Sequence, residues 1–203
     1  MLCYRSVSTW DVDNKEMLIH QLDDPTLEHF SYYDILKAFS IQADYWLNYH
    51  DRFPDGHIIV IDIKDYTLKI IPKCNVMFFR DFLMFLLEGM PVRVKQVHLV
   101  NCPSYVDKLF ALVKPVLPTE ICNIIKFHEN SAGLLKAIGK QYLPTEYGGD
   151  AGSMKEQHMQ WVEKLEEMRK SFQNDNLWKS DLKKKPKSGT VEMSGSFKTL
   201  CID

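Results

Sequence analysis

The run HIIVIDI at residues 57–63 constrains the fold of this chain more than any other part of the sequence. Its residues are apolar and mostly β-branched, which is typical of a central strand covered on both faces. Further strand-like runs are predicted at residues 16–22, 95–101 and 121–128. Helix-like runs lie between them, and the longest covers residues 32–50. This alternation predicts an α/β fold with a mostly parallel central sheet.

A change of composition at about residue 150 divides the chain. We expect an α/β domain over residues 16–150, preceded by an N-terminal extension over residues 1–15. Residues 151–180 are charged and carry an apolar stripe, which predicts a C-terminal helix. The lysine-rich and Ser/Gly-rich residues 181–203 predict a flexible tail.

Composition and short motifs argue against several classes of function. The formal net charge of -2 gives no general attraction to nucleic acid, so no nucleic-acid partner is expected. The five cysteines include no CxxC pair, which argues against a zinc site or a disulfide framework and favours a cytoplasmic protein. The sequence contains none of the motifs GxGxxG, GxxxxGK, GxSxG and HExxH, so we expect no cofactor and no metal.

Asp62 is the strongest candidate for catalysis, because it stands at the carboxyl end of an apolar strand with Asp65 three residues further on. An aspartate at that place more often caps the following turn. No partner base and no second ligand pattern accompanies it. We therefore predict no catalytic residue and no enzymatic activity.

Residues 75–89 predict a helix of unusual composition. Only Arg80, Asp81 and Glu88 are charged, so apolar side chains surround nearly the whole circumference, whereas a surface helix has a single apolar stripe. The helix is either buried in a solid core, or it packs on the sheet with one face and lines a ligand cavity with another. Its apolar cluster at residues 76–87 is too short to cross a bilayer, which needs roughly 20 apolar residues, so no transmembrane segment is expected.

Two neighbouring segments are compatible with membrane contact. Residues 103–122 carry a wide apolar surface that Pro115 and Pro118 interrupt, so the segment is either a kinked core helix or a lid. A lid would close over an apolar site and present its apolar face to a bilayer when open. Arg93 and Lys95, at the start of the next predicted strand, either bind phosphoinositide headgroups or are ordinary solvated cations.

Three ordered motifs give the chain a resemblance to a known family. The most specific is LPTEYGGD at residues 143–150. Upstream lie the strand with Asp62 and the stretch VHLVN at residues 97–101, which Lys114-Pro115 follows. Together these motifs resemble the CRAL-TRIO lipid-binding domain family over about residues 16–150. The ending at residues 195–203 is similar to the tails of insect members that are alpha-tocopherol transfer protein-like.

The resemblance implies a sheet floor, a helical wall and a mobile helical lid that enclose an apolar cavity. The wall positions that it implies are Ile59, Ile61, Phe82, Phe85, Leu86, Met90, Val92 and Val94. The apolar positions that it implies for the lid, within residues 103–122, are Leu109, Phe110, Val113, Val116 and Leu117. It also places Arg93 and Lys95 where relatives carry a basic pair that contacts phosphoinositide phosphates.

The chain departs from the family pattern at three places. Asp65 stands where the family commonly has a glycine after the strand. Glu120 and Ile124 stand where relatives have two further basic headgroup positions, so we expect the phosphoinositide contact to be weak. Most members begin with a small helical domain. Only about fifteen residues precede the first predicted strand here, so we expect that domain to be lacking.

The resulting hypothesis is intracellular binding and transfer of a small hydrophobic ligand, such as a tocopherol, a retinoid or a carotenoid. The expected partners are this lipid and, transiently, an anionic membrane surface that contains phosphoinositide, so the protein is expected to be cytoplasmic and peripheral to membranes. Two alternatives stay open. One is a truncated interaction module that transports nothing, and the other is an exchange protein for phosphatidylinositol or another phospholipid.

Overall fold

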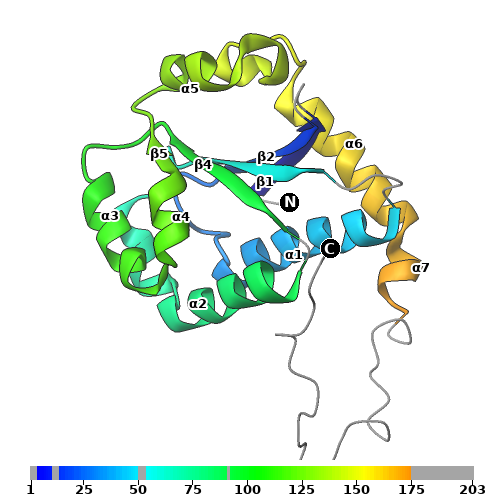
Figure 1. Ribbon diagram of the computed structural model, residues 1–203, viewed down its shortest axis with the longest axis horizontal. Coiled ribbons are helices and arrows are strands. Elements are labelled where there is room, and N and C mark those ends of the chain that lie inside the picture. Colours follow the sequence, from blue (N-terminus) through cyan, green and yellow to red (C-terminus); the bar gives the residue numbers. More distant parts are fainter. Residues whose placement is uncertain (1–3, 11–13, 50–53, 91, 175–203) are drawn as a thin grey trace, which may run out of the picture. The chain divides into compact units, whose positions relative to one another are not determined.

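The computed structural model describes residues 4–10, 14–49, 54–90 and 92–174 (Figure 1). The chain forms two compact units, residues 1–164 and residues 165–203, and each is described by itself. The expectations for residues 175–203, which include the flexible tail and the family-like ending, lie outside the described residues.

The first unit is built on a sheet whose five described strands follow one another in chain order. The strands are β1 (Tyr4–Trp10), β2 (Lys15–Leu22), β3 (Gly56–Asp62), β4 (Val94–Val100) and β5 (Ile125–Phe127). β1 pairs with β2 in the antiparallel sense, and β2 to β5 are parallel. The predicted α/β fold with a mostly parallel sheet is confirmed. β1, which lies within the expected N-terminal extension over residues 1–15, pairs with β2 in this sheet.

The described helices connect the strands or follow the last one. They are α1 (Tyr32–Tyr49), α2 (Val76–Met84), α3 (Val106–Val113), α4 (Thr119–Ile124), α5 (Ser131–Ile138), α6 (Met154–Glu167) and α7 (Arg169–Phe172). Short helical turns supplement them: η1 (Leu68–Lys73), η2 (Phe85–Gly89), η3 (Lys114–Val116), η4 (Lys140–Tyr142) and η5 (Thr145–Tyr147). The helix expected over residues 151–180 is therefore two helices in the described residues, with a break at Met168.

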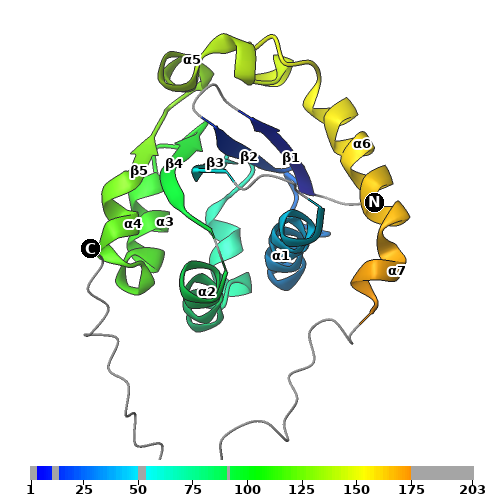
Figure 2. The same cartoon turned by 45° about the vertical axis from the view of Figure 1, so that its right-hand side comes forward.

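The connecting helices cover one face of the sheet, because right-handed crossovers between strands in sequential order return on the same side. Figure 2 shows α1 and α2 on one side of the strands and α5 on the other. The two faces carry different side chains, since successive residues of a strand point to opposite faces. In β3, Ile58 and Val60 face the α5 side, and Ile59 and Ile61 face the α1 and α2 side.

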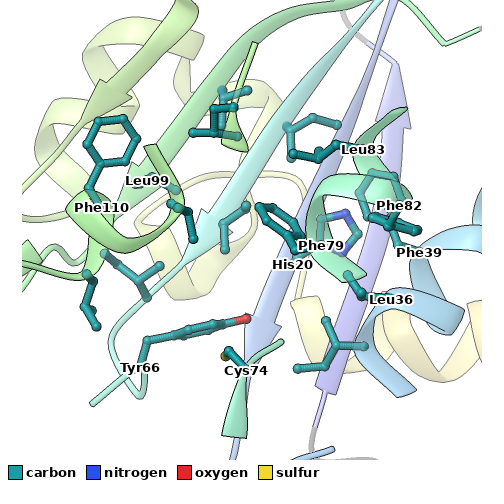
Figure 3. Close-up of a pocket in the computed structure, with 18 of the residues that line it drawn as sticks. His20, Leu36, Phe39, Tyr66, Cys74, Phe79, Phe82, Leu83, Leu99 and Phe110 are labelled. Atoms are coloured by element: carbon teal, nitrogen blue, oxygen red, sulfur yellow. The ribbon is translucent and has the colours of Figure 1, made fainter. Parts of the chain in front are cut away.

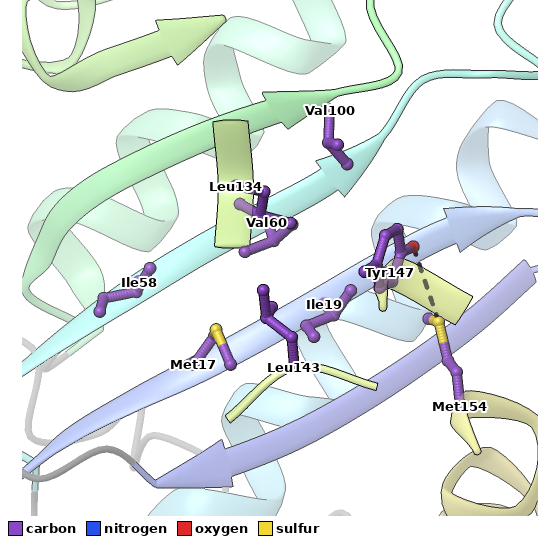
Figure 4. Packing of buried hydrophobic residues seen from close by; sticks show 9 residues of the cluster. All are labelled: Met17, Ile19, Ile58, Val60, Val100, Leu134, Leu143, Tyr147 and Met154. Atoms are coloured by element: carbon purple, nitrogen blue, oxygen red, sulfur yellow. Dashed lines mark hydrogen bonds between the residues drawn. The ribbon is translucent and has the colours of Figure 1, made fainter. Parts of the chain in front are cut away.

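The face toward α5 is packed solid. Its buried cluster consists of Met17, Ile19, Ile58, Val60, Val100, Leu134, Leu143, Tyr147 and Met154 (Figure 4). Every one of these side chains is at most 5% exposed, and they come from three strands, from α5 and from the segment that ends at α6. This cluster therefore covers the face of the sheet toward α5 with buried side chains.

Candidate functional site

A cavity of about 380 Å³ lies between the sheet and the connecting helices. Two rows of neighbouring residues cross the strands at its floor. Ile59 pairs with Val97 and Val97 with Ile125. His20 pairs with Ile61 and Ile61 with Leu99. The remaining wall comes from α1, η1, α2, η2, α3 and α4, and Figure 3 shows side chains from opposite sides pointing into one common space.

Helix α2 and the turn η2 that follows it line the cavity with one side. Its N-terminus is capped by Asn75, whose side chain accepts a hydrogen bond from the Phe78 amide at 3.0 Å. From α2 and η2 the cavity is lined by Val76, Phe79, Phe82, Leu83, Leu86 and Leu87. The opposite side of the helix is exposed, with Met77 at 55% and Phe78 at 41%. The apolar circumference therefore lines a cavity on one side and faces solvent on the other, in place of packing into a solid core.

Most of the predicted wall positions lie at the cavity. Lining residues among them are Ile59, Ile61, Phe82, Leu86, Val92 and Val94. Phe85 is not among the lining residues, since it is 52% exposed on the outer side of the helix. Met90 also lies outside the lining and packs against the buried cluster that includes Val92 and Val97.

The segment expected to be a lid consists of α3, η3 and α4. Pro115 lies inside η3 and Pro118 precedes α4, so the prolines divide the segment as expected. Its residues at the cavity are Val106, Leu109, Phe110, Leu112, Val113, Leu117 and Ile121, whereas the predicted Val116 is not among them. Leu112 of α3 and Ile71 of η1 line the cavity and are also 40% and 37% exposed, so they mark its border with solvent.

The described cavity wall contains four polar side chains and no charged one. The polar residues are His20, Tyr32, Tyr66 and Cys74. Burial lowers the pKa of His20 to about 3, so its imidazole is neutral at pH 7. Burial raises the pKa of the Tyr32 hydroxyl and of the Cys74 thiol, so both keep their protons. No sequence motif includes these residues. Each could have been found only as a polar residue at an inward-pointing position of an otherwise apolar strand or loop.

Asp62 has a structural task on the other face of the sheet. Its carboxylate is 2% exposed and accepts hydrogen bonds from four donors. They are Gln21 Nε2 at 3.0 Å, the Lys64 amide at 3.0 Å, Asn101 Nδ2 at 3.0 Å and the Tyr147 hydroxyl at 3.1 Å. Since side chains of three strand ends and of the LPTEYGG segment meet on this carboxylate, Asp62 holds the fold together at this point.

The other residues of LPTEYGG are explained by local geometry. Burial alone would raise the pKa of Glu146, but hydrogen bonds from the Met154 amide at 2.8 Å, the Lys155 amide and Ser153 outweigh it and lower the pKa. This carboxylate thus caps the first turn of α6. At Gly149 a Cβ atom would lie 1.8 Å from the Leu143 carbonyl oxygen, so only glycine fits.

The predicted basic pair lies at the beginning of β4. Arg93 and Lys95 are both exposed. The Arg93 main chain is tied to β3, because its amide donates to His57 Nδ1 at 3.2 Å and its carbonyl accepts from the His57 amide at 2.7 Å. The stem of Lys95 passes over Gly56, where a Cβ atom would lie 2.4 Å from Lys95 Cγ. The structure fixes the backbone of the pair and leaves both side chains exposed.

The structure thus defines a class, an α/β domain in which one face of the sheet is covered by a buried cluster and the other encloses an apolar, uncharged cavity suited to a small hydrophobic molecule. Residues 5–149 match the sequence pattern of the CRAL/TRIO domain. The chain belongs to this family, whose members are generally lipid-binding proteins without enzymatic activity. None of the helices in the described residues is long and apolar enough to cross a membrane.

The similarity to individual relatives is distant. The chain is 32% identical over 120 residues to "Alpha-tocopherol transfer protein-like" of Homo sapiens. The matched residues cover 59% of this chain and 35% of that protein. It is 29% identical over 120 residues to Clavesin-1 of Rattus norvegicus, with 59% of this chain and 34% of the relative covered. The chain thus spans about a third of the length of these curated relatives.

Among solved structures, Sfh5 is similar in fold. The TM-score is 0.51 at 15% sequence identity, and the match covers 75% of this chain and 57% of Sfh5. At this identity the likeness supports the fold alone.

Proposed function

We propose that this chain encloses one small hydrophobic molecule in its cavity and transfers it between membranes in the cytoplasm, without chemical change. The observation that carries the proposal is the cavity of about 380 Å³ between sheet and helices, whose described wall is apolar except for four uncharged polar residues. Each Å² of apolar ligand surface that leaves water contributes about 25 cal/mol, which gives such a space its affinity for a lipid. We also propose that this chain is related to the insect members of the family that are alpha-tocopherol transfer protein-like.

Loading and release need an opening, and α3 with η3 and α4 is proposed to provide it. Leu112 and Ile71 lie at the border of the cavity and are partly exposed, so apolar surface continues from the wall to the outside. Phe110 lines the cavity and its ring contacts that of Phe127 edge to face, with centroids 5.3 Å apart. At a bilayer this surface would exchange its contacts with the cavity for contacts with lipid, while Arg93 and Lys95 meet anionic headgroups.

The proposal is tested with two neighbouring residues of α2 that point in different directions. Leu83 lines the cavity (Figure 3), whereas Met84 is 39% exposed and does not line it. Leu83→Trp should lower lipid transfer between donor and acceptor vesicles by about tenfold, since overlap with a ligand costs roughly 1–3 kcal/mol. Met84→Trp, the matched control, should leave transfer unchanged. Equal transfer by the two variants would contradict enclosure in this cavity.

Membrane contact is tested separately with Phe110→Asp. A carboxylate at the apolar border should weaken both vesicle binding and transfer by about tenfold, because burying a charge without a partner is costly. Sedimentation with vesicles that contain phosphoinositide measures the binding. Transfer that continues at the original rate would refute the role of α3 in opening.

The exposed outer side of α2 favours one alternative, an interaction module. Met77, Phe78 and Phe85 are each more than 40% exposed, and the Phe78 ring contacts that of Tyr33 at a centroid distance of 4.8 Å. Such apolar surface is typical of binding sites for other proteins. Native mass spectrometry separates the two functions, since a carrier retains lipid in the cavity and a module with a vestigial cavity retains none.

A further inference from the structure

The floor of the cavity contains one histidine in an otherwise apolar surface. His20 lies in β2 and faces the cavity, with Ile61 and then Leu99 beside it on the next two strands. It is 2% exposed, so neighbouring side chains cover it almost completely. A floor that served only to exclude water would carry an aliphatic residue there, as the parallel row with Ile59 and Val97 does.

Aromatic rings hold the imidazole in place. The Phe39 ring stacks on His20 with centroids 4.9 Å apart, and Phe82 contacts Phe39 edge to face at 5.9 Å. Figure 3 shows these three rings together at one side of the space. The surroundings keep the imidazole uncharged, because burial lowers its pKa to about 3. A neutral imidazole has one donor nitrogen and one acceptor nitrogen, so it can hydrogen-bond an uncharged polar group but cannot neutralise an anion.

The rest of the wall also favours uncharged ligands. Its other polar side chains are the hydroxyls of Tyr32 and Tyr66 and the thiol of Cys74, and no cation lies among the described lining residues. A carboxylate or phosphate inside would lose its hydration without gaining a charged partner, which costs several kcal/mol. A hydroxyl loses little, because it can donate to the imidazole nitrogen that it meets or accept from it, according to the tautomer present.

We propose that the cavity selects an uncharged lipid with a hydroxyl group, and that His20 determines this specificity by hydrogen-bonding the hydroxyl at the floor. This inference rests on the proposed function and narrows it to lipid alcohols and phenols. Fatty acids and phospholipids are excluded from the cavity as ligands, although their membranes remain the surface from which the alcohol is taken.

The test offers one protein a choice of lipids. The delipidated full chain is incubated with phosphatidylcholine vesicles that carry equal amounts of α-tocopherol, cholesterol, the methyl ether of each, and oleic acid. Native mass spectrometry then identifies the retained lipid. The wild type should retain an alcohol over its own methyl ether by about tenfold, which corresponds to one net hydrogen bond.

Three variants assign the preference to His20. His20→Leu should reduce the preference for the alcohol to less than about twofold while total lipid uptake persists, since the apolar wall is intact. His20→Gln, which keeps a donor and an acceptor, should preserve most of it. Met159→Leu, at an exposed position of α6 that does not line the cavity, is the control and should leave the preference unchanged.

The outcomes separate this inference from the proposed function. A wild type that retains oleic acid, phosphatidylcholine or the methyl ethers as readily as the alcohols overturns the inference and leaves enclosure of a lipid intact. A preference for the alcohol that survives in His20→Leu overturns the assignment to His20. A wild type that takes up no lipid from these vesicles contradicts both proposals.

Discussion

The replacement of Tyr147 by phenylalanine is the sharpest test of how LPTEYGG acts. The Tyr147 side chain is 1% exposed, and its hydroxyl donates to the buried Asp62 carboxylate at 3.1 Å and contacts Met154 Sδ at 3.8 Å. Burial and the Asp62 charge raise the pKa of this hydroxyl, so it remains a donor at every accessible pH. Tyr147→Phe removes one hydrogen bond to a charged acceptor and almost no volume.

A hydrogen bond to a charged group contributes about 1.5–3 kcal/mol. Three other donors stay on Asp62, so the carboxylate is not left without partners, and the loss should fall within that range. For a unit of this size, 1 kcal/mol corresponds to about 2–4 °C in Tm, so Tm should fall by about 3–12 °C. Asp62→Asn should lower the free energy of unfolding by more than this, because the amide nitrogen of Asn is a hydrogen-bond donor and would face the donors that now bond the Asp62 carboxylate.

Differential scanning calorimetry measures the effect, and Tyr142→Phe is the matched control. Tyr142 packs against the same buried cluster, and its hydroxyl makes no hydrogen bond within the described part of the chain. The Tm of Tyr142→Phe should therefore stay within about 1 °C of the wild-type value. Lipid uptake by folded Tyr147→Phe should equal that of the wild type, because Tyr147 lies on the face of the sheet opposite the cavity. An unchanged Tm, or a stable variant without lipid uptake, would refute a purely structural role for this contact.

Two further predictions concern stability. Gly149→Ala should destabilise the fold by about 3 kcal/mol or more in urea unfolding, because its Cβ would collide with the Leu143 backbone. Gly152→Ala, whose Cβ would make only an ordinary contact with Gln157 Nε2 at 3.9 Å and whose φ is +86, should destabilise it by about 1 kcal/mol. Acid should also destabilise the fold. Burial lowers the pKa of His20 to about 3 and that of His98 to about 4, so the unfolded chain takes up protons below pH 6.5 while the folded chain does not. Stability should therefore fall as pH falls from 6.5 toward 4, by up to about 1.4 kcal/mol per pH unit for each histidine, and urea midpoints that do not change between pH 7 and 5 would contradict this.

The strands that lie inside the sheet could be predicted closely from the sequence. β2, β3 and β4 begin within about one residue of the expected positions, because continuous apolar runs leave few alternatives. β1 was not predicted, because its sequence lacks such an apolar run. As an antiparallel strand at the edge of the sheet it needs no apolar run, and the sequence YRSVSTW has none.

The cavity itself was less predictable, because composition does not say which side of a helix is covered. Phe85 and Leu86 are adjacent and both apolar, yet the first is 52% exposed and the second is 5% exposed at the cavity. The helix widens here from α2 to the π-helical turn η2, which changes the direction in which each following residue points. Sequence periodicity assumes regular turns and therefore fails at such a place.

The motif that identifies the family and the residues that would select a ligand lie on opposite faces of the sheet. Along β3 the side chains alternate, so Asp62 points to Tyr147 and the solid face, whereas Ile61 beside it points into the cavity. The contacts of Asp62, Glu146 and Tyr147 therefore stabilise the fold without lining the cavity. The specificity that we propose for this chain therefore depends on positions without a motif, such as His20.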